Sequence, residues 1–523
     1  MVKLSVILSI LLAVLFSTTS TLAHSQKVDN QRTMPSSADI DQYILEQIAN
    51  KNVVGMSVAV VQDNEIIYLK GFGTASVKNQ NPVTPQTIFD LASCSKSFTA
   101  MATLLLWNDG KIDLDQSLQY YIPEFQLKDT EISSQITVRQ LLNQTSGLPG
   151  NVSEPMAFHN TTEELIAAMK KVNIDSSPGS EFGYSNMNYC LLGALVERVS
   201  SKTFEDFMQE RVFMPLGMVN STLKPEVAEK LDRADGHQLM LGKIVVRHTP
   251  IYHSVAPAGW VMSSSEDMGK WLQLNINGGR LNNQQIIPEN VIQIMQKPGV
   301  NLIKDGEKAS YGMGWFIDEI NDSETVIWHG GDTTDFLSEM IILPDRKLGL
   351  VMLVNSQTSR DAHSIAIGIA SLLIGAELKL PASPWWASWA EIDRIALIAV
   401  IMAVVLTLSL IPYLWWQSRI IRRYRKREKV PPYTKKTMKI LSFVFPVTPW
   451  VILSVVATVA YIVMQTLFGF DIFLIIVRFG MFAPPGVLIA AAAIMASILL
   501  WMLALTITGY IRVTARAKAY PKP

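Results

Sequence analysis

The residues best suited to chemistry are a serine and a lysine three positions apart. Ser93 and Lys96 begin an apolar run with helical spacing over residues 93–107. Side chains three apart on a helix lie on one face, so the hydroxyl meets an amine whose pKa falls on burial. The backbone N–H of Ser93 stays free at the helix N-terminus. The pair therefore predicts a nucleophile, a base and half of an oxyanion hole within one turn.

Two further motifs follow along the chain. A loop rich in proline and glycine ends in Tyr184 and Asn186, which can point into one cleft as a proton relay and a hydrogen-bonding amide. His329-Gly330-Gly331-Asp332 stands between two strand patterns. Glycine there permits close approach of a ligand, and the next N–H can complete the oxyanion hole. Each motif alone also has a structural explanation, as a tyrosine over a core, an asparagine in a turn, or a bulge beside an edge histidine.

The elements around these motifs predict an α/β domain. Two β-branched runs, 53–61 and 65–70, form a hairpin about Asp63-Asn64. Further strand patterns lie at 312–317, 325–328, 337–343 and 348–355. Helical spacing occurs at 36–50, 93–107, 137–144, 161–171, 189–200, 203–212, 263–276, 288–296 and 360–374. Two early and three or four late strands predict one antiparallel sheet built from both ends of the domain, with the middle helices as a second lobe.

Apolar segments lie outside this domain. Residues 1–23 are typical of a signal peptide, with Lys3 before an apolar run and a small-x-Ala exit at Ala23; an uncleaved anchor is the alternative. Three stretches are long and apolar enough to cross a bilayer: 395–416, 443–468 and 485–509.

Charge orients these segments. The loop after the first span and the tail after the third are strongly basic, so both are expected in the cytoplasm. The signal peptide independently places the large domain outside. The expected organisation is a signal peptide at 1–23, an extracytoplasmic domain at 24–378, a linker at 379–393, a three-helix membrane domain at 394–510 and a cytoplasmic tail at 511–523.

Composition excludes several functions. Residues 24–390 hold 28 Lys and Arg against 41 Asp and Glu, a net charge of about −13, which argues against nucleic-acid binding. Cys94 and Cys190 are expected as two small buried residues, with a disulfide as the alternative. The histidines are too irregularly spaced for a helical metal site, so neither a metal nor a cofactor is predicted.

Together the three motifs resemble the serine β-lactamase and penicillin-binding-protein superfamily, in its class C-like branch, over about residues 36–376. Supporting stretches lie at 136–149, 213–218, 257–260, 263–268 and 311–315. The resemblance implies a beta-lactamase-like antiparallel sheet flanked by helices, with an all-helical lobe.

The resemblance also implies roles. Ser93 would be acylated, Lys96 would take its proton, and Tyr184 would pass a proton to the leaving amine. Asn186 would orient the acyl-side amide of the substrate. The N–H groups of Ser93 and Asp332, the latter following Gly331, would hold the oxyanion.

One departure affects the substrate. His329 stands where many relatives have the lysine of a K-T-G strand, and a neutral imidazole does not attract a carboxylate as an ammonium does. This weakens the case for an efficient β-lactamase or D-Ala carboxypeptidase.

The architecture resembles the prodrug-activating, colibactin-type membrane peptidases, which remove an N-acyl-D-asparagine from an exported precursor. Those enzymes carry Asn where this chain has Asp335, so Asp335 would select a different D-residue or none.

The sequence therefore predicts a serine hydrolase in the cytoplasmic membrane, with its catalytic domain facing the periplasm or exterior. Its partners would be the lipid bilayer and a small-molecule or peptide substrate, an N-acyl-D-aminoacyl amide. The alternatives are a D,D-peptidase, weak β-lactamase or esterase, and a non-catalytic β-lactam or peptidoglycan sensor.

Overall fold

The structure is a computed structural model. It describes residues 34–51, 53–150, 161–247, 252–304, 307–320, 324–357, 363–377, 389–426 and 485–519. The signal peptide predicted at 1–23 and the middle membrane span predicted at 443–468 lie outside these residues.

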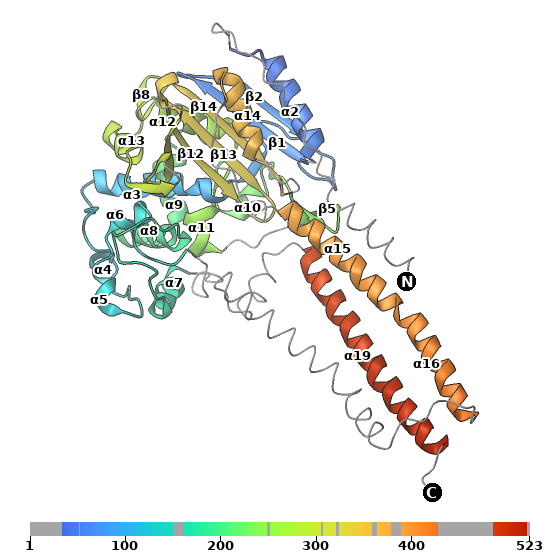
Figure 1. Cartoon of the computed structure of the whole chain (residues 1–523). Coiled ribbons are helices and arrows are strands. Elements are labelled where there is room, and N and C mark those ends of the chain that lie inside the picture. Colours follow the sequence, from blue (N-terminus) through green and yellow to red (C-terminus); the bar gives the residue numbers. More distant parts are fainter. Residues whose placement is uncertain are drawn as a thin grey trace.

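A large antiparallel sheet forms the centre of the domain (Figure 1). Its eight strands run in the order β2-β1-β14-β13-β12-β11-β10-β9. They are β1 Gly55–Gln62, β2 Glu65–Gly73, β9 Val300–Lys304, β10 Glu307–Gly312, β11 Trp315–Ile320, β12 Glu324–Asp332, β13 Leu337–Leu343 and β14 Leu348–Val354. The sheet predicted from both ends of the domain is confirmed. Its second half supplies six strands rather than three or four, because a turn separates β10 from β11 and β9 adds a further edge strand.

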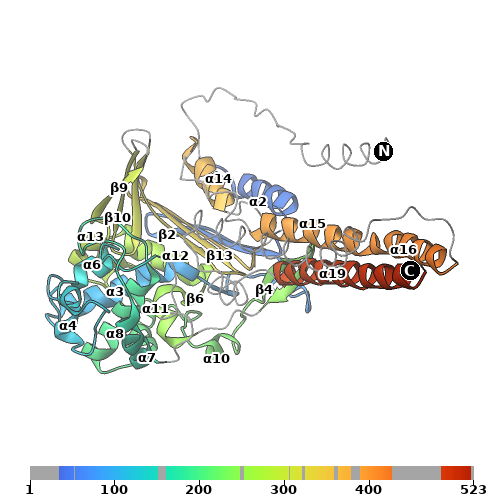
Figure 2. The same ribbon diagram turned by 60° about the horizontal axis from the view of Figure 1, so that its bottom comes forward.

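Helices cover both faces of the sheet. Along β1, Val58 and Val60 enter one apolar core, whereas Ala59 and Val61 enter the other. This alternation follows from the two-residue period of a strand. Helices α2 (Ser37–Lys51) and α14 (His363–Ile374) lie together on one face (Figure 2). Helix α12 (Ser265–Ile276) packs on the other.

The helical lobe lies on the α12 side. Helix α3 (Ser95–Asn108) is its buried centre, where the ring of Phe98 stacks on Trp271 with centroids 3.9 Å apart. The other helices of the lobe are α4 Leu118–Tyr121, α5 Thr130–Ser133, α6 Val138–Leu142, α7 Thr162–Ala168, α8 Asn186–Ser200, α9 Phe204–Met208, α10 Pro225–Ala228, α11 Ala256–Gly259 and α13 Glu289–Met295.

Short sheets join the lobe to the central sheet. Strand β3 (Ile88–Asp90) pairs with β6 (Met262–Ser264), and these precede α3 and α12 respectively. The β4–β5 hairpin (Gly236–Met240 and Lys243–Arg247) pairs through β4 with β15 (Ser356–Gln357). The two-stranded β7–β8 ribbon joins Arg280–Leu281 to Gln284–Gln285.

Two long apolar helical segments project from the domain. Helices α15 (Trp389–Leu408) and α16 (Leu410–Arg425) form one and α19 (Pro485–Ala519) the other. Within the described residues these two are long and apolar enough to cross a membrane. They contain the first and third predicted spans. Helix α15 begins inside the segment expected as a linker, and α19 continues into the expected tail.

Candidate active site

Ser93 lies at a strained turn just before α3. It belongs to the short 3-10 helix Ala92–Cys94, which follows β3. Ala92 has a φ of +47°, a left-handed conformation that non-glycine residues seldom adopt. Ser93 is partly exposed, whereas its neighbours Cys94 and Ser95 are buried. The turn thus leaves Ser93 partly exposed between buried neighbours.

Lys96 is buried with its amine directed at Ser93. Its Nζ lies 3.0 Å from Ser93 Oγ, 2.7 Å from Asn186 Oδ1 and 2.7 Å from the carbonyl oxygen of Ala258. None of these three acceptors is a carboxylate. Burial therefore lowers the pKa of Lys96 to about 7. A neutral amine within hydrogen-bond reach of a serine hydroxyl can act as its base.

Tyr184 covers the lysine from the other side. Nζ of Lys96 lies 4.9 Å from the centre of the Tyr184 ring. Burial raises the pKa of the Tyr184 phenol well above its ordinary value, although a hydrogen bond with Ser93 acts in the opposite direction. Tyr184 is therefore a neutral phenol, which can relay a proton between the serine oxygen and a leaving group.

Aromatic side chains continue from Tyr184 onto strands β11 and β12. The Tyr184 ring stacks on Phe316 with an interplanar angle of 9°, and Phe316 stacks on Trp328 with centroids 4.9 Å apart. Phe182 approaches the same group, with its centroid 6.4 Å from that of Phe316. Phe182, Tyr184 and Phe316 form an apolar wall near Ser93, whereas Trp328 packs with the core on the α14 face of the sheet.

Strand β12 passes close to the Ser93 backbone. A Cβ atom on Gly331 would collide with the Leu91 carbonyl oxygen and would lie 3.0 Å from the amide nitrogen of Ser93. Only glycine fits at this approach. Cys94 Sγ donates to the carbonyl oxygen of His329 at 3.1 Å, which ties the serine turn to the strand. Gly331 thus lies directly against the backbone of Ser93.

One edge of β12 is open at the site. Its ladder with β11 ends at the pair formed by Phe316 and Trp328. Residues 329–332 pair only with β13 among the described strands. An extended backbone can add to such an edge as a further strand.

His329 is a buried, neutral residue. Its Nδ1 lies 2.7 Å from the carbonyl oxygen of Gly330 and carries the proton in this pair. Burial, and then the nearby Lys96, lower the pKa of His329 to about 3. Its Nε2 has no hydrogen-bond partner in the described part of the chain. The residue therefore supplies no positive charge to hold a carboxylate.

The structure places the other predicted substrate-binding residues as follows. Asn186 is the first residue of α8, not part of a loop, because hydrogen bonds from Ser185 to Gln144 and Pro149 end the loop one residue earlier. Its amide oxygen accepts from Lys96. Asp332 turns its carboxylate away from Ser93 to His363 of α14, at 2.9 Å.

Asp335 departs furthest from its prediction. Its side chain is 1% exposed, accepts from the Thr333 hydroxyl at 3.0 Å and packs against Gly236 of β4. The role of substrate selection assigned to it does not fit this buried position in the β12–β13 turn.

Two groups at the site were not anticipated as functional. The Ala258 carbonyl is a backbone atom of α11, and no side-chain pattern marks it. Phe316 belongs to a strand that was predicted as ordinary core.

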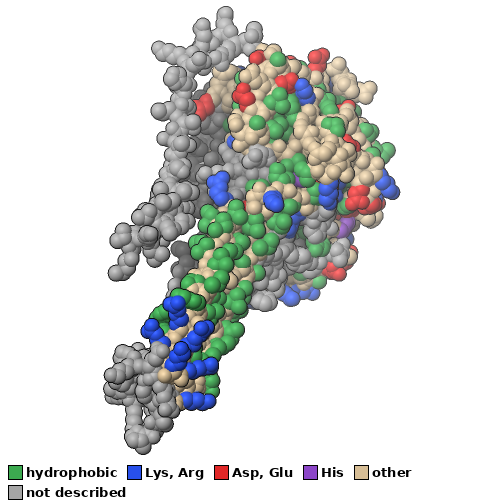
Figure 3. Space-filling view, turned by 90° about the vertical axis from the view of Figure 1, so that its right-hand side faces the viewer, with side chains coloured by type: hydrophobic (Ala, Val, Ile, Leu, Met, Phe, Trp, Pro, Cys, Tyr) green, Lys and Arg blue, Asp and Glu red, His purple; other side chains and the backbone are tan. Residues whose placement is uncertain are grey.

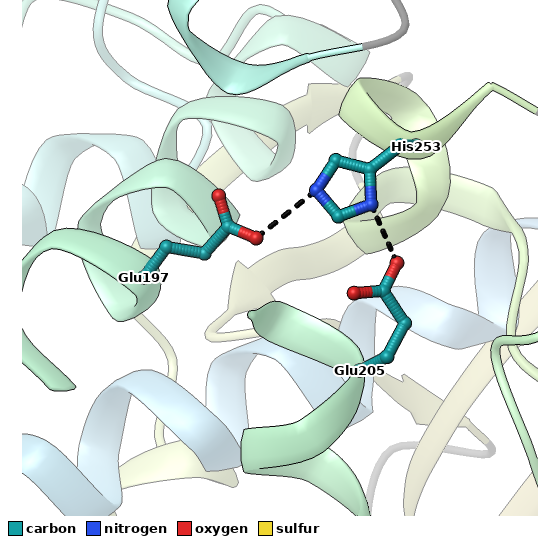
Figure 4. A group of neighbouring side chains, drawn as sticks. All are labelled: Glu197, Glu205 and His253. Atoms are coloured by element: carbon teal, nitrogen blue, oxygen red, sulfur yellow. Dashed lines mark hydrogen bonds and ion pairs between the residues drawn. The ribbon is translucent and has the colours of Figure 1, made fainter. Parts of the chain in front are cut away.

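A second polar cluster lies in the helical lobe (Figure 4). His253 Nε2 is 3.0 Å from Glu197 Oε1, and Nδ1 is 2.7 Å from Glu205 Oε1. The atoms are close enough to be considered as metal ligands. Both ring nitrogens, however, are directed at carboxylates, and these glutamates raise the pKa of His253 to about 10. The arrangement is that of an imidazolium between two carboxylates.

Comparison with known proteins agrees with this geometry. A family profile described as Beta-lactamase matches residues 40–374. The chain belongs to the beta-lactamase family. Members of this family are generally serine hydrolases, and the resemblance to the β-lactamase and penicillin-binding-protein superfamily is confirmed.

Individual relatives of this beta-lactamase-family chain are distant. Protein flp of Staphylococcus aureus strain MW2 is 28% identical over 329 residues, which are 62% of this chain and 64% of flp. Penicillin-binding protein 4* of Bacillus subtilis strain 168 is 24% identical over 369 residues, 66% of this chain and 77% of that protein. The structure of the octameric penicillin-binding protein homologue from Pyrococcus abyssi matches with a TM-score of 0.59 and 27% identity, covering 69% of this chain and 81% of that one. The chain thus spans less than two thirds of the length of flp.

Proposed function

We propose that the chain is a membrane-tethered serine hydrolase that cleaves an N-acyl-D-aminoacyl amide through an acyl-enzyme. The contact that carries the proposal is the buried Lys96 amine 3.0 Å from Ser93 Oγ, with no carboxylate among its acceptors. Lys96 removes the Ser93 proton, and the hydroxyl oxygen attacks the substrate carbonyl. The N–H groups of Ser93 and Asp332 bind the oxyanion, and Tyr184 delivers a proton to the leaving amine.

The class of substrate follows from what lines the site. A neutral His329 offers no partner for a free carboxylate, and the wall of Phe182, Tyr184 and Phe316 favours an apolar group. The open edge at 329–332 accommodates an extended peptide backbone. An amide-linked, acylated peptide satisfies all three features. The D configuration rests on the resemblance to colibactin-type peptidases.

The membrane segments support an acylated substrate. Hydrophobic side chains cover the projecting helices, and Lys and Arg gather at their far end (Figure 3). By the positive-inside rule this basic end is cytoplasmic, which leaves the catalytic domain outside. The domain contacts the N-terminal end of α15, where this helix begins. There the buried Asp393 carboxylate accepts from the N–H groups of Leu241 and Gly242 in the β4–β5 hairpin, both at 2.8 Å. A substrate whose acyl chain is in the bilayer would therefore be held near the site.

The β4–β5 hairpin also contacts the turn that follows β12, next to the active site. His237 of β4 donates its N–H to the carbonyl oxygen of Asp335 at 3.4 Å, and Gln238 donates to that of Thr334. The hairpin that rests on α15 thus also holds the turn that follows β12.

The test is turnover by the full-length protein in liposomes. Fluorogenic N-acyl-D-aminoacyl amides with short and long acyl chains are compared with their L-isomers, with nitrocefin and with peptides ending in D-Ala-D-Ala. We expect D-selective cleavage that increases with acyl length, and no cleavage by Ser93→Ala. Mass spectrometry should find the acyl group on Ser93. If the protein cleaved only nitrocefin or D-Ala-D-Ala peptides, the proposal that it cleaves N-acyl-D-aminoacyl amides would be refuted.

A second candidate is a D,D-peptidase, weak β-lactamase or esterase. It is favoured by the names of two relatives, both described as penicillin-binding. The same panel separates it from the first. A sensor would instead remain acylated by a β-lactam without turnover, and the Lys96–Ser93 contact speaks against it.

A further inference from the structure

A charged cluster lies behind strand β12, on the face opposite Ser93. His363, the first residue of α14, stands between Asp332 at the end of β12 and Glu339 of β13. Its Nε2 is 2.9 Å from Asp332 Oδ2, and its Nδ1 makes a short contact with Glu339 Oε2. Gln357 of β15 donates to the other Asp332 oxygen at 2.7 Å. Both carboxylate oxygens of Asp332 are thus held.

The ring of His363 carries two protons in this arrangement. Asp332 and Glu339 are acceptors as carboxylates, so each nitrogen donates to one of them. Burial raises the pKa of Glu339, and the charge of His363 acts to lower it. Partial burial acts to lower the pKa of His363, but the charges of Asp332 and Glu339 raise it well above its ordinary value. Glu339 is 2% exposed, and its Oε1 has no partner in the described residues. Its compensation depends on His363, because an unpaired buried charge is costly. On α2, which packs against α14, Lys51 Nζ donates to the neighbouring Ser364 at 2.6 Å.

One strand separates this cluster from the nucleophile. A Cβ on Gly331 would lie 3.0 Å from the Ser93 nitrogen, whereas a Cβ on Gly330 would lie 3.0 Å from Glu339 Oε2 and 3.1 Å from His363 Cε1. Successive residues of a strand face opposite sides. The backbone of 330–332 is therefore confined by the serine turn on one side and by the His363 ring on the other.

We propose that His363 is a positioning residue for the oxyanion hole. Its imidazolium binds Asp332 and Glu339 at once and so fixes the end of β12, whose Asp332 N–H is the second oxyanion donor. This inference rests on the proposed function. His363 touches no substrate. The position of the Asp332 N–H matters most when the oxyanion forms in the transition state. Replacing His363 should therefore lower kcat more than it raises KM.

The test measures kcat and KM of the full-length protein in detergent with p-nitrophenyl acetate, together with the rate of Ser93 labelling by a fluorophosphonate. For His363→Gln we expect a fall in kcat of about 10- to 100-fold, since displacing a reacting group by about 1 Å can cost about 100-fold. KM should stay within about threefold. His363→Lys, which keeps a cation between the carboxylates, should recover much of the loss.

The matched control is His253→Gln. It removes the same imidazolium between two carboxylates, but in the helical lobe, so it should leave kcat unchanged. Equal effects of the two variants on kcat and on labelling would overturn the inference. If His363→Gln does not fold, Gln357→Leu removes the other anchor of Asp332 and should give a smaller loss of kcat; unchanged kcat there would also overturn it. Wild-type protein that neither hydrolyses the ester nor labels at Ser93 would instead refute the proposed function, and the inference with it.

Discussion

The two faces of strand β12 differ in charge although they are one backbone apart. On the face toward Ser93, His329 is neutral and the pKa of Lys96 is lowered to about 7. On the face toward α14, the charges of Asp332 and Glu339 keep His363 protonated. All three basic groups are largely removed from water, which by itself favours the neutral form. What differs is the partner. Lys96 meets a hydroxyl, an amide and a carbonyl, whereas His363 meets two carboxylates.

The difference shows how one strand can serve both rigidity and catalysis. A lysine can act as a base near neutral pH only where no carboxylate stabilises its charged form. Ionic contacts that hold the strand must then lie elsewhere. Placing them on the opposite face keeps the anions away from a forming oxyanion, while the backbone transmits the restraint.

The largest effect should come from replacing Lys96 with methionine. This change keeps the buried length of the side chain and removes the base, so kcat/KM for p-nitrophenyl acetate should fall by about 10³-fold. Lys96→Arg is the control, because arginine keeps the positive charge but does not lose its proton. The arginine variant should be as inactive as the methionine variant. Retained activity in it would mean that charge, not proton removal, is what Lys96 supplies.

A pair of glycine substitutions compares the two faces directly. Gly331→Ala places a Cβ against the Leu91 carbonyl and 3.0 Å from the Ser93 nitrogen, and should reduce kcat by about 10²-fold by displacing an oxyanion donor. Gly330→Ala meets the ends of two side chains, Glu339 and His363, which can shift. Its kcat should stay within about tenfold of wild type. Equal losses, with both variants equally stable on heating, would show that the faces are not distinct.

The pH dependence of the wild-type enzyme gives a smaller but separate test. The pKa of Lys96 is lowered to about 7, and the proposed base is its neutral form. The value of kcat/KM for a neutral ester should therefore rise with pH, tenfold per unit below about pH 7, and level off above it. His329, with a pKa of about 3, does not titrate in this range. His329→Gln should therefore leave the rise of kcat/KM at the same pH. A shift of this rise in the variant would mean that it reports the titration of His329 and not of Lys96.

Much of this site could be predicted from the sequence, and the reason is local. Ser93 and Lys96 are joined by one helical turn, so their contact follows from spacing alone. The N-terminal cap of α12 is equally local, because the Ser264 hydroxyl accepts from the Asp267 N–H three residues on, at 3.3 Å. The strands about Asp63-Asn64 also formed where alternation placed them.

Contacts across the fold could not be predicted in this way. His363 reaches Asp332 only because α14 packs behind β12. The two residues are 31 positions apart, and no local sequence pattern predicts their contact. Asp335 looked suited to a substrate because the resemblance placed it near the site. Its burial against β4 depends on a hairpin supplied by a distant segment. His253 was set aside as a ligand on spacing, yet the fold brings two glutamates to it.

The histidine in the helical lobe should affect stability alone, which sharpens the comparison of the two faces. In His253→Gln the hydrogen bonds to Glu197 and Glu205 lose their charge, and we expect the free energy of unfolding to fall by about 2 kcal/mol at pH 6. The pKa of His253 is raised to about 10 in the folded protein, so its contribution is complete below the ordinary pKa near 6.5 and is lost as the pH rises through about 10. The difference in thermal unfolding temperature between wild type and variant should therefore shrink from pH 6 toward pH 10. A constant difference would mean that the ring is held by packing, and the triad in Figure 4 would then not be ionic.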